Sequence, residues 1–445
     1  MSFPRYPTYK DSGVGWLGEV PDEWDICEGK RVFCSRRQIA LESDPQLAAS
    51  QKFGVIPQSL MMELNDSKVM LALKGTESFR HVEENDFVVS LRSFEGGIEH
   101  SNYRGCVSPA YTVLHATKPV ESGFFRHLFK SGPYVSALQS TTDSLRDGKS
   151  ISYQQFGAIP VPLPPLGEQQ AIATFLDHET TKIDALIAEQ ENLIALLKEK
   201  RQAVISHAVT KGLDPTVPMK DSGIEWLGEV PDHWSLKRLK QLLKKSGLVR
   251  GPFGGDLKKE IFVDEGYKVY EQKNAIYKNF ALGDSYISEQ KYTEMQRFRV
   301  RKNDYILSCS GTIGKAFRIP SEAPDGIINQ ALLIVRFDDS IISIFSDWIF
   351  EANFFQLQIL DNSQGGAMKN LVGMDIFTCI VLPVPPRSEQ KAIAAYLDNE
   401  TAKLDDLTTE AQHTIDLLKE RRSALISAAV TGKIDVRRLS DKVLQ

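Results

Sequence analysis

The chain has 445 residues, of which 42% are hydrophobic and 25% charged, a composition typical of a globular protein of two or three domains. No apolar run reaches the ~18–20 residues that span a bilayer, the N-terminal sequence lacks the pattern of a signal peptide, and the five scattered cysteines predict reduced thiols in a cytoplasm. The formal net charge of −5 argues against indiscriminate binding of polyanions, so any contact with nucleic acid must be local.

A short motif opens each half of the chain. KDSGVGWLGEVPDEW at residues 10–24 returns as KDSGIEWLGEVPDHW at residues 220–234. In each copy, turn-forming residues surround an apolar core with two tryptophans. We expect the segment to be ordered and to dock its tryptophans, Trp16 and Trp226 among them, either on a helix of the same chain or on a partner protein.

Two regions of mixed character follow these motifs, at residues 25–160 and 235–380. Their short β-branched and aromatic runs are broken by Gly, Asn, Asp and Pro, which predicts strands joined by turns. ENDFVVS at residues 84–90 matches KNDYILS at residues 302–308. The two regions are therefore expected to be diverged copies of one fold.

Each region is predicted to end in a helix, at residues 122–138 and 344–360. A polar loop follows in each case, at residues 140–150 and 361–370. These loops lead directly into the proline-rich start of the next feature.

The strongest feature is a long stretch that occurs twice, at residues 164–214 and 385–435. Roughly half of the aligned positions are identical, all at an offset of 221 residues. Apolar residues recur every seven positions, prolines precede each copy and a glycine ends it, which predicts two amphipathic helices. The uninterrupted part, from about Thr180 to Thr210, would be ~45 Å long at ~1.5 Å per residue, and its apolar seam needs the other copy as its partner. The residues expected to line this contact are Ile183, Leu186, Leu193, Leu197 and Val204 in the first copy, and Leu404, Leu407, Leu418 and Leu425 in the second.

The chain therefore divides into seven expected segments. They are an entrance segment (1–24), a first domain (25–160), a long helix (161–213), a second entrance segment (214–234), a second domain (235–380), a second long helix (381–435) and a tail (436–445).

No catalytic motif is recognisable in the sequence. SGTIGKA at residues 310–316 resembles a phosphate-binding loop, but Cys309 stands where a glycine is required and Ala316 where Ser or Thr would hold magnesium. HExxH, GxSxG and clustered Cys and His residues are absent. We expect a non-catalytic chain that holds no metal or cofactor of its own.

Taken together, the repeated motifs resemble the specificity (S) subunit of type I restriction-modification systems over nearly the whole chain. The marks are SGxxWLGEVPDxW opening each half, PPxxEQxxIxxxLDxET opening each helix, and TKGLD or TGKID closing it. The resemblance implies an α+β fold: two similar mixed α/β target-recognition domains separated by two long antiparallel coiled-coil helices, with a pseudo-two-fold internal repeat. It also implies double-stranded DNA, methyltransferase (modification) subunits that bring S-adenosylmethionine, and restriction (motor-nuclease) subunits with ATP and Mg²⁺ as partners.

This architecture suits a DNA site in two halves. A ~45 Å spacer corresponds to about 13 base pairs at ~3.4 Å per pair, so short half-sites separated by unread pairs are expected. Lengthening either helix should change the gap and leave the half-sites alone.

Base recognition needs donors and small polar residues on loops that enter a groove, with Lys and Arg on phosphates. In the first domain the candidates are Arg92, Ser93, Phe94, Arg146 and Lys149. In the second domain they are Arg250, Lys258, Ser310, Thr312, Lys315, Gln364, Lys369 and Asn370. The alternative for each is a solvated loop residue or a turn former.

Matching polar residues near the start of each long helix form a second candidate site. We hypothesise that they bind two copies of one methyltransferase subunit, whereas the alternative is helix capping and intrachain ion pairing. These residues are Glu168, Gln169, Asp177 and Glu179 in the first copy, and Glu389, Gln390, Asp398 and Glu400 in the second.

Three other interpretations remain at this stage. The chain could serve a methylation-only or fused system without a motor subunit, which gene neighbours would reveal. It could be a scaffold for two modules that bind no DNA, or a stand-alone enzyme, which the missing motifs disfavour.

Overall fold

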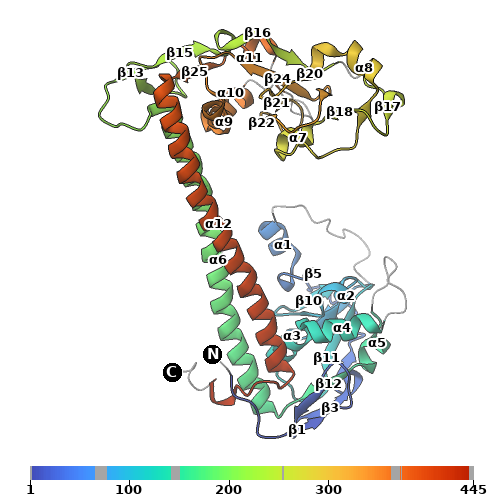
Figure 1. The fold of residues 1–445 in the computed structure, drawn as a ribbon. Helices are drawn as coiled ribbons and strands as arrows, with labels where there is room; N and C mark the ends of the chain where they lie inside the picture. The colour runs from blue at the N-terminus through green and yellow to red at the C-terminus, as the bar shows by residue number, and fades with distance from the viewer. Residues whose placement is uncertain are drawn as a thin grey trace. The chain divides into compact units, whose positions relative to one another are not determined.

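The structure is a computed structural model that describes residues 3–65, 78–141, 151–252, 255–361, 371 and 373–439. The chain forms two compact units, which we call unit 1 (Met1–Glu191 with Gln412–Gln445) and unit 2 (Asn192–Ala411). Each unit contains one mixed domain and part of both long helices (Figure 1). The helices are thus shared by the two units instead of forming segments of their own. No described helix is long and apolar enough to cross a membrane.

The two long helices are α6 (Leu166–Lys211, 46 residues) and α12 (Arg387–Val430, 44 residues). At ~1.5 Å per residue they are ~69 and ~66 Å long. The first helix is longer than the uninterrupted stretch expected from Thr180 to Thr210, because its first turn begins directly after two prolines. The Glu168 amide already donates to the Pro165 carbonyl at 2.9 Å.

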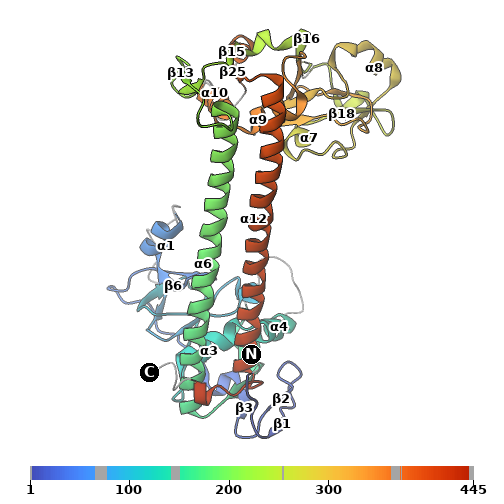
Figure 2. The same ribbon diagram turned by 60° about the vertical axis from the view of Figure 1, so that its left-hand side comes forward.

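Within each unit, a segment of α6 lies beside a segment of α12 (Figure 2). Four residues of the predicted seam are buried, at 4–8% exposure: Ile183, Leu197, Leu404 and Leu425. Val204 and Leu418 are half-buried. The expectation was wrong for Leu186, Leu193 and Leu407, which are 45%, 41% and 48% exposed. In each heptad the second apolar residue of the seam lies four residues after the first, as Ile187 lies four residues after Ile183. Residues that lie three residues after the first, such as Leu186, therefore point to solvent.

Each long helix ends at a glycine in the left-handed conformation, Gly212 (φ 77°) and Gly432 (φ 72°). A Cβ at Gly212 would lie 3.2 Å from the Trp234 ring, and one at Gly432 would lie 2.4 Å from Pro21. Glycine is therefore required at these positions for two reasons. The φ angle is one that other residues rarely adopt, and the entrance motif packed against the glycine leaves no room for a Cβ.

Unit 1 is built on a four-stranded antiparallel sheet in the order β4-β11-β8-β9. Its strands are β4 (Phe33–Ser35), β11 (Thr112–Ala116), β8 (Phe87–Val89) and β9 (Glu99–His100). Four two-stranded antiparallel pairs surround it: β1 (Tyr9–Asp11) with β2 (Glu19–Pro21), β3 (Asp25–Glu28) with β12 (Pro160–Leu163), β5 (Leu47–Ser50) with β6 (Gly54–Pro57), and β7 (Arg80–Val82) with β10 (Gly105–Val107).

Unit 2 repeats the four-stranded antiparallel sheet in the order β16-β24-β21-β22. Its strands are β16 (Leu243–Arg250), β24 (Leu332–Phe337), β21 (Tyr305–Ser308) and β22 (Ala316–Arg318). A second sheet has the order β17-β19-β18-β23-β20 and one parallel pair, β18 with β23: β17 (Phe262–Val263), β19 (Tyr286–Ile287), β18 (Tyr267–Tyr270), β23 (Gly326–Ile328) and β20 (Arg299–Val300). Two further pairs are β13 (Met219–Asp221) with β14 (Glu229–Pro231), and β15 (Ser235–Arg238) with β25 (Val381–Val384).

The matching sequences ENDFVVS and KNDYILS occupy equivalent places in the two sheets. They enter the strands β8 and β21 through asparagines with positive φ, Asn85 at 70° and Asn303 at 66°. The aspartate that follows each asparagine is buried and binds an arginine: Asp86 binds Arg36 at 2.7 and 3.0 Å, and Asp304 binds an arginine of β24. The prediction of two diverged copies of one fold is confirmed.

The helices that cover these sheets are broken where single helices were predicted. Unit 1 has α3 (Ser122–Lys130) and α4 (Gly132–Ser140), and unit 2 has α9 (Ser343–Glu351) and α10 (Asn353–Asp361). In unit 1 the break precedes Pro133, which has no N–H to continue the helix. The remaining described helices of four or more residues are α1 (Gln58–Asn65), α2 (Ser93–Gly96), α5 (Tyr153–Ala158), α7 (Gln272–Ile276), α8 (Glu289–Glu294) and α11 (Met374–Phe377).

The core of each unit joins domain and long helices. In unit 1, aromatic residues of the domain, including Phe33, Phe125 and Phe129, share one buried cluster with Leu176 of α6 and Val430 of α12. Unit 2 has an equivalent cluster that includes residues of both long helices. Each domain is therefore fixed to the helices by burial of apolar surface.

Candidate nucleic-acid interface

The entrance motifs dock on the starts of the long helices. In unit 1 the buried Trp24 donates from Nε1 to Glu168 Oε1 at 3.0 Å, and the Tyr6 hydroxyl donates to the same oxygen at 2.5 Å. In unit 2 Trp234 donates from Nε1 to Glu389 Oε2 at 2.9 Å. One arrangement thus occurs in both units, and its carboxylates serve contacts within the chain.

The glutamines that follow these two glutamates connect the first turn of each long helix to the domain of the same unit by hydrogen bonds. Gln169 accepts from the Glu121 amide at 2.9 Å and donates to the Pro164 carbonyl at 2.8 Å. Gln390 accepts from the Ile342 amide at 2.9 Å and donates to two carbonyl oxygens.

The hypothesis that these residues bind a partner was wrong for three of them. Glu168, Gln169 and Gln390 are only 6%, 2% and 0% exposed, so their side chains cannot reach a partner. The same residue types occur at these positions in both copies because the buried polar groups around them need the same hydrogen bonds. Glu389 keeps a side-chain exposure of 39% and also binds His233.

The first tryptophans of the entrance motifs pack on the domains. Trp16 meets Tyr134 edge-on with ring centroids 5.7 Å apart, and Trp226 stacks on Phe354 at 6.0 Å. Both tryptophans are half-buried. Both tryptophans therefore pack on a helix of their own unit, Trp16 on α4 and Trp226 on α10.

Asp177 joins α6 to α3 in unit 1. It accepts hydrogen bonds from Arg126 and, at 2.6 Å, from His127 Nε2. Burial alone would raise the pKa of Asp177, but the bond from His127 and the charge of Arg126 outweigh it and lower that pKa. The carboxylate is therefore held ionised at the joint between domain and helix.

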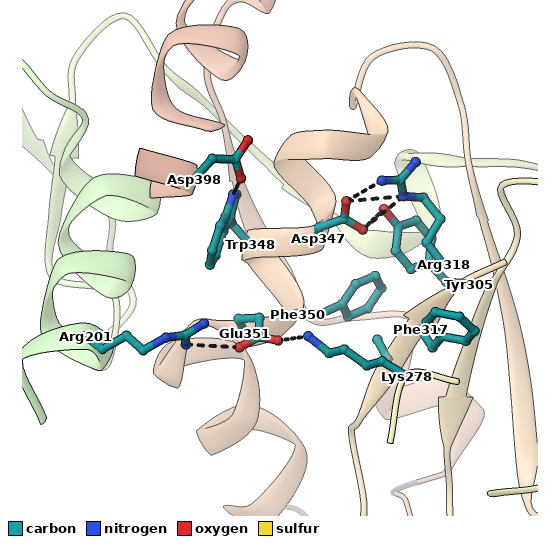
Figure 3. Close-up of a pocket in the computed structure, with 11 residues that line it drawn as sticks. Arg201, Lys278, Tyr305, Phe317, Arg318, Asp347, Trp348, Phe350, Glu351 and Asp398 are labelled. Carbon is teal, nitrogen blue, oxygen red and sulfur yellow. Dashed lines mark hydrogen bonds and ion pairs between the residues drawn. The ribbon is translucent and has the colours of Figure 1, made fainter. Parts of the chain in front are cut away.

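The equivalent joint in unit 2 lines a pocket of about 330 Å³ (Figure 3). Asp398 accepts from Trp348 Nε1 at 3.1 Å, and Asp347 accepts from Tyr305 and Arg318. Glu351, one turn further along α9, lies between two cations from other elements, Arg201 at 3.4 Å and Lys278 (Figure 3). Burial would raise the pKa of Glu351, but Lys278 and Arg201 outweigh it and lower that pKa. The charges in this pocket neutralise one another.

The last two helix candidates form ordinary surface pairs. Glu179 binds Lys182 at 3.0 Å and Glu400 binds Lys403 at 2.6 Å, each three residues further along the helix. Such pairs contribute little to stability, and these carboxylates remain available to a partner.

The structure separates the first-domain DNA candidates into different roles. Arg92 is exposed before α2. The expectation was wrong for Ser93, which is 1% exposed and accepts the Ser90 amide at 2.8 Å. Phe94 is half-buried against the core of unit 1. Arg146 and Lys149 lie outside the described residues.

Three of the second-domain candidates, Ser310, Thr312 and Lys315, lie on the loop after β21. Thr312 and Lys315 are exposed and Ser310 is half-buried. Arg250, at the end of β16, lies beside the Cys309 thiol; burial raises the pKa of this thiol to about 12, against the lowering effect of Arg250. Lys258 is exposed on a separate loop. Gln364, Lys369 and Asn370 lie outside the described residues.

Two glutamines that the sequence did not single out support these loops. Gln51 donates to the Arg92 carbonyl at 3.4 Å, and Gln272 donates to the carbonyls of Ser310 and Thr312. Neither glutamine follows a recognisable motif. A search for polar residues at similar distances before the two matching strands could have found the pair.

The described residues contain no cluster of three or more His, Cys, Asp or Glu that could hold a metal ion. The candidate sites are thus of two kinds. One is the loop after β8 in unit 1 and after β21 in unit 2. The other is the polar contact between a domain helix and a long helix at Asp177 and at Asp398.

The fold and these paired sites define a duplicated chain, and comparison with known proteins shows what it is similar to. Residues 231–417 match the family model of the type I restriction modification DNA specificity domain. The MjaVIII type I restriction enzyme specificity subunit of Methanocaldococcus jannaschii is 23% identical over 95% of both chains. The EcoKI specificity subunit of Escherichia coli is 23% identical over 94% of this chain and 90% of its own.

Solved structures share the fold. A chain from a study of complex assembly and conformational transition of the type I R-M system matches with a TM-score of 0.69 and 15% identity, over 92% of this chain and 98% of that one. The HsdS subunit of Thermoanaerobacter tengcongensis matches with a TM-score of 0.53 and 16% identity, over 93% and 98%. The matched domain and these relatives agree with the resemblance to specificity subunits of type I restriction-modification systems that was drawn from the motifs.

Proposed function

We propose that each unit reads one half of a bipartite DNA site, with the loop after its central strand as the reader. The observation that carries this proposal is the repeated four-stranded sheet, which presents a loop at the same place in each unit. Unit 1 presents the exposed Arg92, whereas unit 2 presents Thr312 and Lys315. Because Arg pairs well with guanine and Thr with several base edges, the two half-sites should differ.

The long helices set the gap between the half-sites in this proposal. Both helices are shared by the two units, so a change in their length changes the distance that the unread base pairs must span. The chain performs this role in the cytoplasm and without catalysis of its own.

The same proposal assigns methylation and cleavage to partner subunits. Two methyltransferase subunits would bring S-adenosylmethionine, and restriction subunits would bring ATP and Mg²⁺. Matching leucines support helix docking of the first partner: Leu186 and Leu407 are 45% and 48% exposed, and Leu196 and Leu417 are 54% and 51% exposed.

Point substitutions in the two loops test the reading role. We expect Arg92→Ala to relax one half of the methylated motif and Thr312→Ala to relax the other half, each by about 1–3 kcal/mol of discrimination. The measurement is methylation of a duplex library by the chain together with its methyltransferase subunit. Substitutions that weaken methylation equally at all bases, or that alter both halves together, would count against separate readers.

A further inference from the structure

Unit 1 contains a second polar site that the reading loop does not include. It is a cavity of about 700 Å³ beside the joint between α3 and the long helices. Its walls come from the β5–β6 hairpin tip, from β9 and the residues after it, from α3, and from α6 and α12. The charged side chains that line it are Lys52, Arg126, Lys130, Arg422, Glu99 and Asp177.

Cations outnumber carboxylates in this cavity. Asp177 pairs with Arg126, Glu99 pairs with Lys130 at 2.5 Å, and Arg422 pairs with a carboxylate outside the cavity. Lys52 has no carboxylate within ion-pair distance among the described residues and lies 4.9 Å from the Phe53 ring. The cavity therefore holds one cation whose charge is uncompensated, in polar surroundings.

Buried groups on the wall are also left without partners. His100 is 8% exposed, and its Nδ1 has no hydrogen-bond partner within the described part of the chain. Glu99 is 1% exposed, burial raises its pKa, and its Oε2 has no hydrogen-bond partner among the described residues. A polar cavity of this size with few apolar walls does not suit an apolar ligand.

The equivalent place in unit 2 has the opposite chemistry. Asp347 and Glu351 stand 221 positions after Arg126 and Lys130, so α9 presents carboxylates where α3 presents cations. These carboxylates are neutralised by cations from other elements, and the pocket is about half as large, at about 330 Å³. An excess of cations thus distinguishes the unit 1 cavity from the equivalent pocket of unit 2.

We propose that the cavity around Lys52 binds a phosphoryl group, supplied by the backbone of the DNA that unit 1 reads. The hairpin tip that carries Lys52 also carries Gln51, whose amide supports the Arg92 loop at 3.4 Å. A phosphate held here would fix the register of that loop on the duplex, since phosphate contacts position a protein and base contacts specify the sequence. This inference rests on the proposed reading function.

Salt dependence of DNA binding separates a phosphate contact from a structural lysine. The experiment uses the full-length chain in complex with its methyltransferase subunit and measures the dissociation constant against salt concentration. We expect Lys52→Ala to weaken binding several-fold on cognate and non-cognate duplexes alike and to reduce the slope of log K against log salt by about one. Lys52→Arg should keep the wild-type slope.

Lys30→Ala is the matched control, because it removes one exposed lysine of unit 1 that already pairs with Glu28 at 3.1 Å. It should leave the slope unchanged. An unchanged slope for Lys52→Ala, with wild-type DNA binding intact, overturns the contact of Lys52 with the DNA backbone and leaves the reading function standing. A wild-type complex that binds no DNA at any salt concentration overturns both.

Pyrophosphate distinguishes the two sources of a phosphoryl group. We expect it to bind the DNA-free chain weakly and to compete with DNA for the wild type but not for Lys52→Ala. Tight, saturable binding that requires Lys52, combined with an unchanged DNA slope for Lys52→Ala, would assign the cavity to a free anion and contradict the backbone source.

Discussion

Arg422 of α12 donates two hydrogen bonds to the carboxylate of Asp184 in α6, at 2.8 and 3.1 Å. The residues 221 positions away repeat the pair with the helices exchanged, since Arg201 of α6 donates to Asp405 of α12 at 3.0 Å. One pair lies in unit 1 and the other in unit 2. This exchange is what two copies of one helix require when they pack in opposite directions.

The Arg422–Asp184 pair should determine the register of α6 against α12 in unit 1 and contribute little to the free energy of unfolding. Its side chains are 38% and 53% exposed, so a double-mutant cycle should give a coupling of about 0.2–1 kcal/mol. Reversal of one charge, as in Asp184→Arg, should destabilise unit 1 slightly, and the swapped double variant with Arg422→Asp should recover the loss. Urea denaturation measures each step, and a swap that recovers nothing would argue against the register.

Adjacent leucines in unit 2 test the helix seam. Leu197 is 8% exposed and Leu196 is 54% exposed. Leu197→Ala should cost about 2 kcal/mol or more of unfolding free energy, because it leaves a cavity in the seam. Leu196→Ala should change stability by less than about 0.5 kcal/mol. Equal effects in urea denaturation would mean that the seam has been assigned to the wrong face.

Glu168 should be important for docking of the first entrance motif. Glu168→Ala leaves the buried Trp24 and Tyr6 donors unsatisfied, so we expect a loss of about 1–3 kcal/mol. Glu179→Ala is the control, since it removes only a surface pair with Lys182 and should cost less than about 0.5 kcal/mol. Hydrogen exchange at residues 10–24 reports the same event locally. Slow exchange there in Glu168→Ala would contradict the docking role.

His100 should make unit 1 less stable in mild acid. Burial lowers the pKa of His100 from 6.5 to about 4, with a further lowering by Arg126. Between pH 6.5 and about 4, His100 is therefore protonated in the unfolded chain and neutral in the folded chain. The contribution of neutral His100 to the free energy of unfolding is present above pH 6.5 and is lost as the pH falls. His100→Gln should remove that part of the pH dependence. NMR titration of labelled histidines would contradict the account if His100 gained its proton near pH 6.5.

The repeated parts of the fold could be predicted because repetition exposes them. The offset of 221 residues identified the long helices, and the matched strands β8 and β21 identified the common sheet. Local pattern was insufficient at Leu186, because heptad position alone did not show whether the second apolar residue follows at three or four residues. It was also insufficient at Gln169, whose burial depends on a contact with Glu121, far away in the sequence.

The joints between domain and helix could not be read from the sequence for a different reason. Asp177 and Asp398 are identical in the two copies, but their partners are Arg126 with His127 in unit 1 and Trp348 in unit 2. Equivalent positions carry opposite or neutral side chains, so comparison of the copies does not indicate a shared site. Only the tertiary contacts show that both aspartates connect a long helix to a helix of the domain.

The most direct test of the reading function is genome-wide mapping of modified bases in a host that expresses this chain with a partner methyltransferase subunit. We expect one new bipartite motif: two unlike short halves around a fixed gap of unread base pairs. A contiguous motif would contradict the assignment of one half-site to each unit. No modified base, although both proteins are made and associate, would contradict the reading function itself.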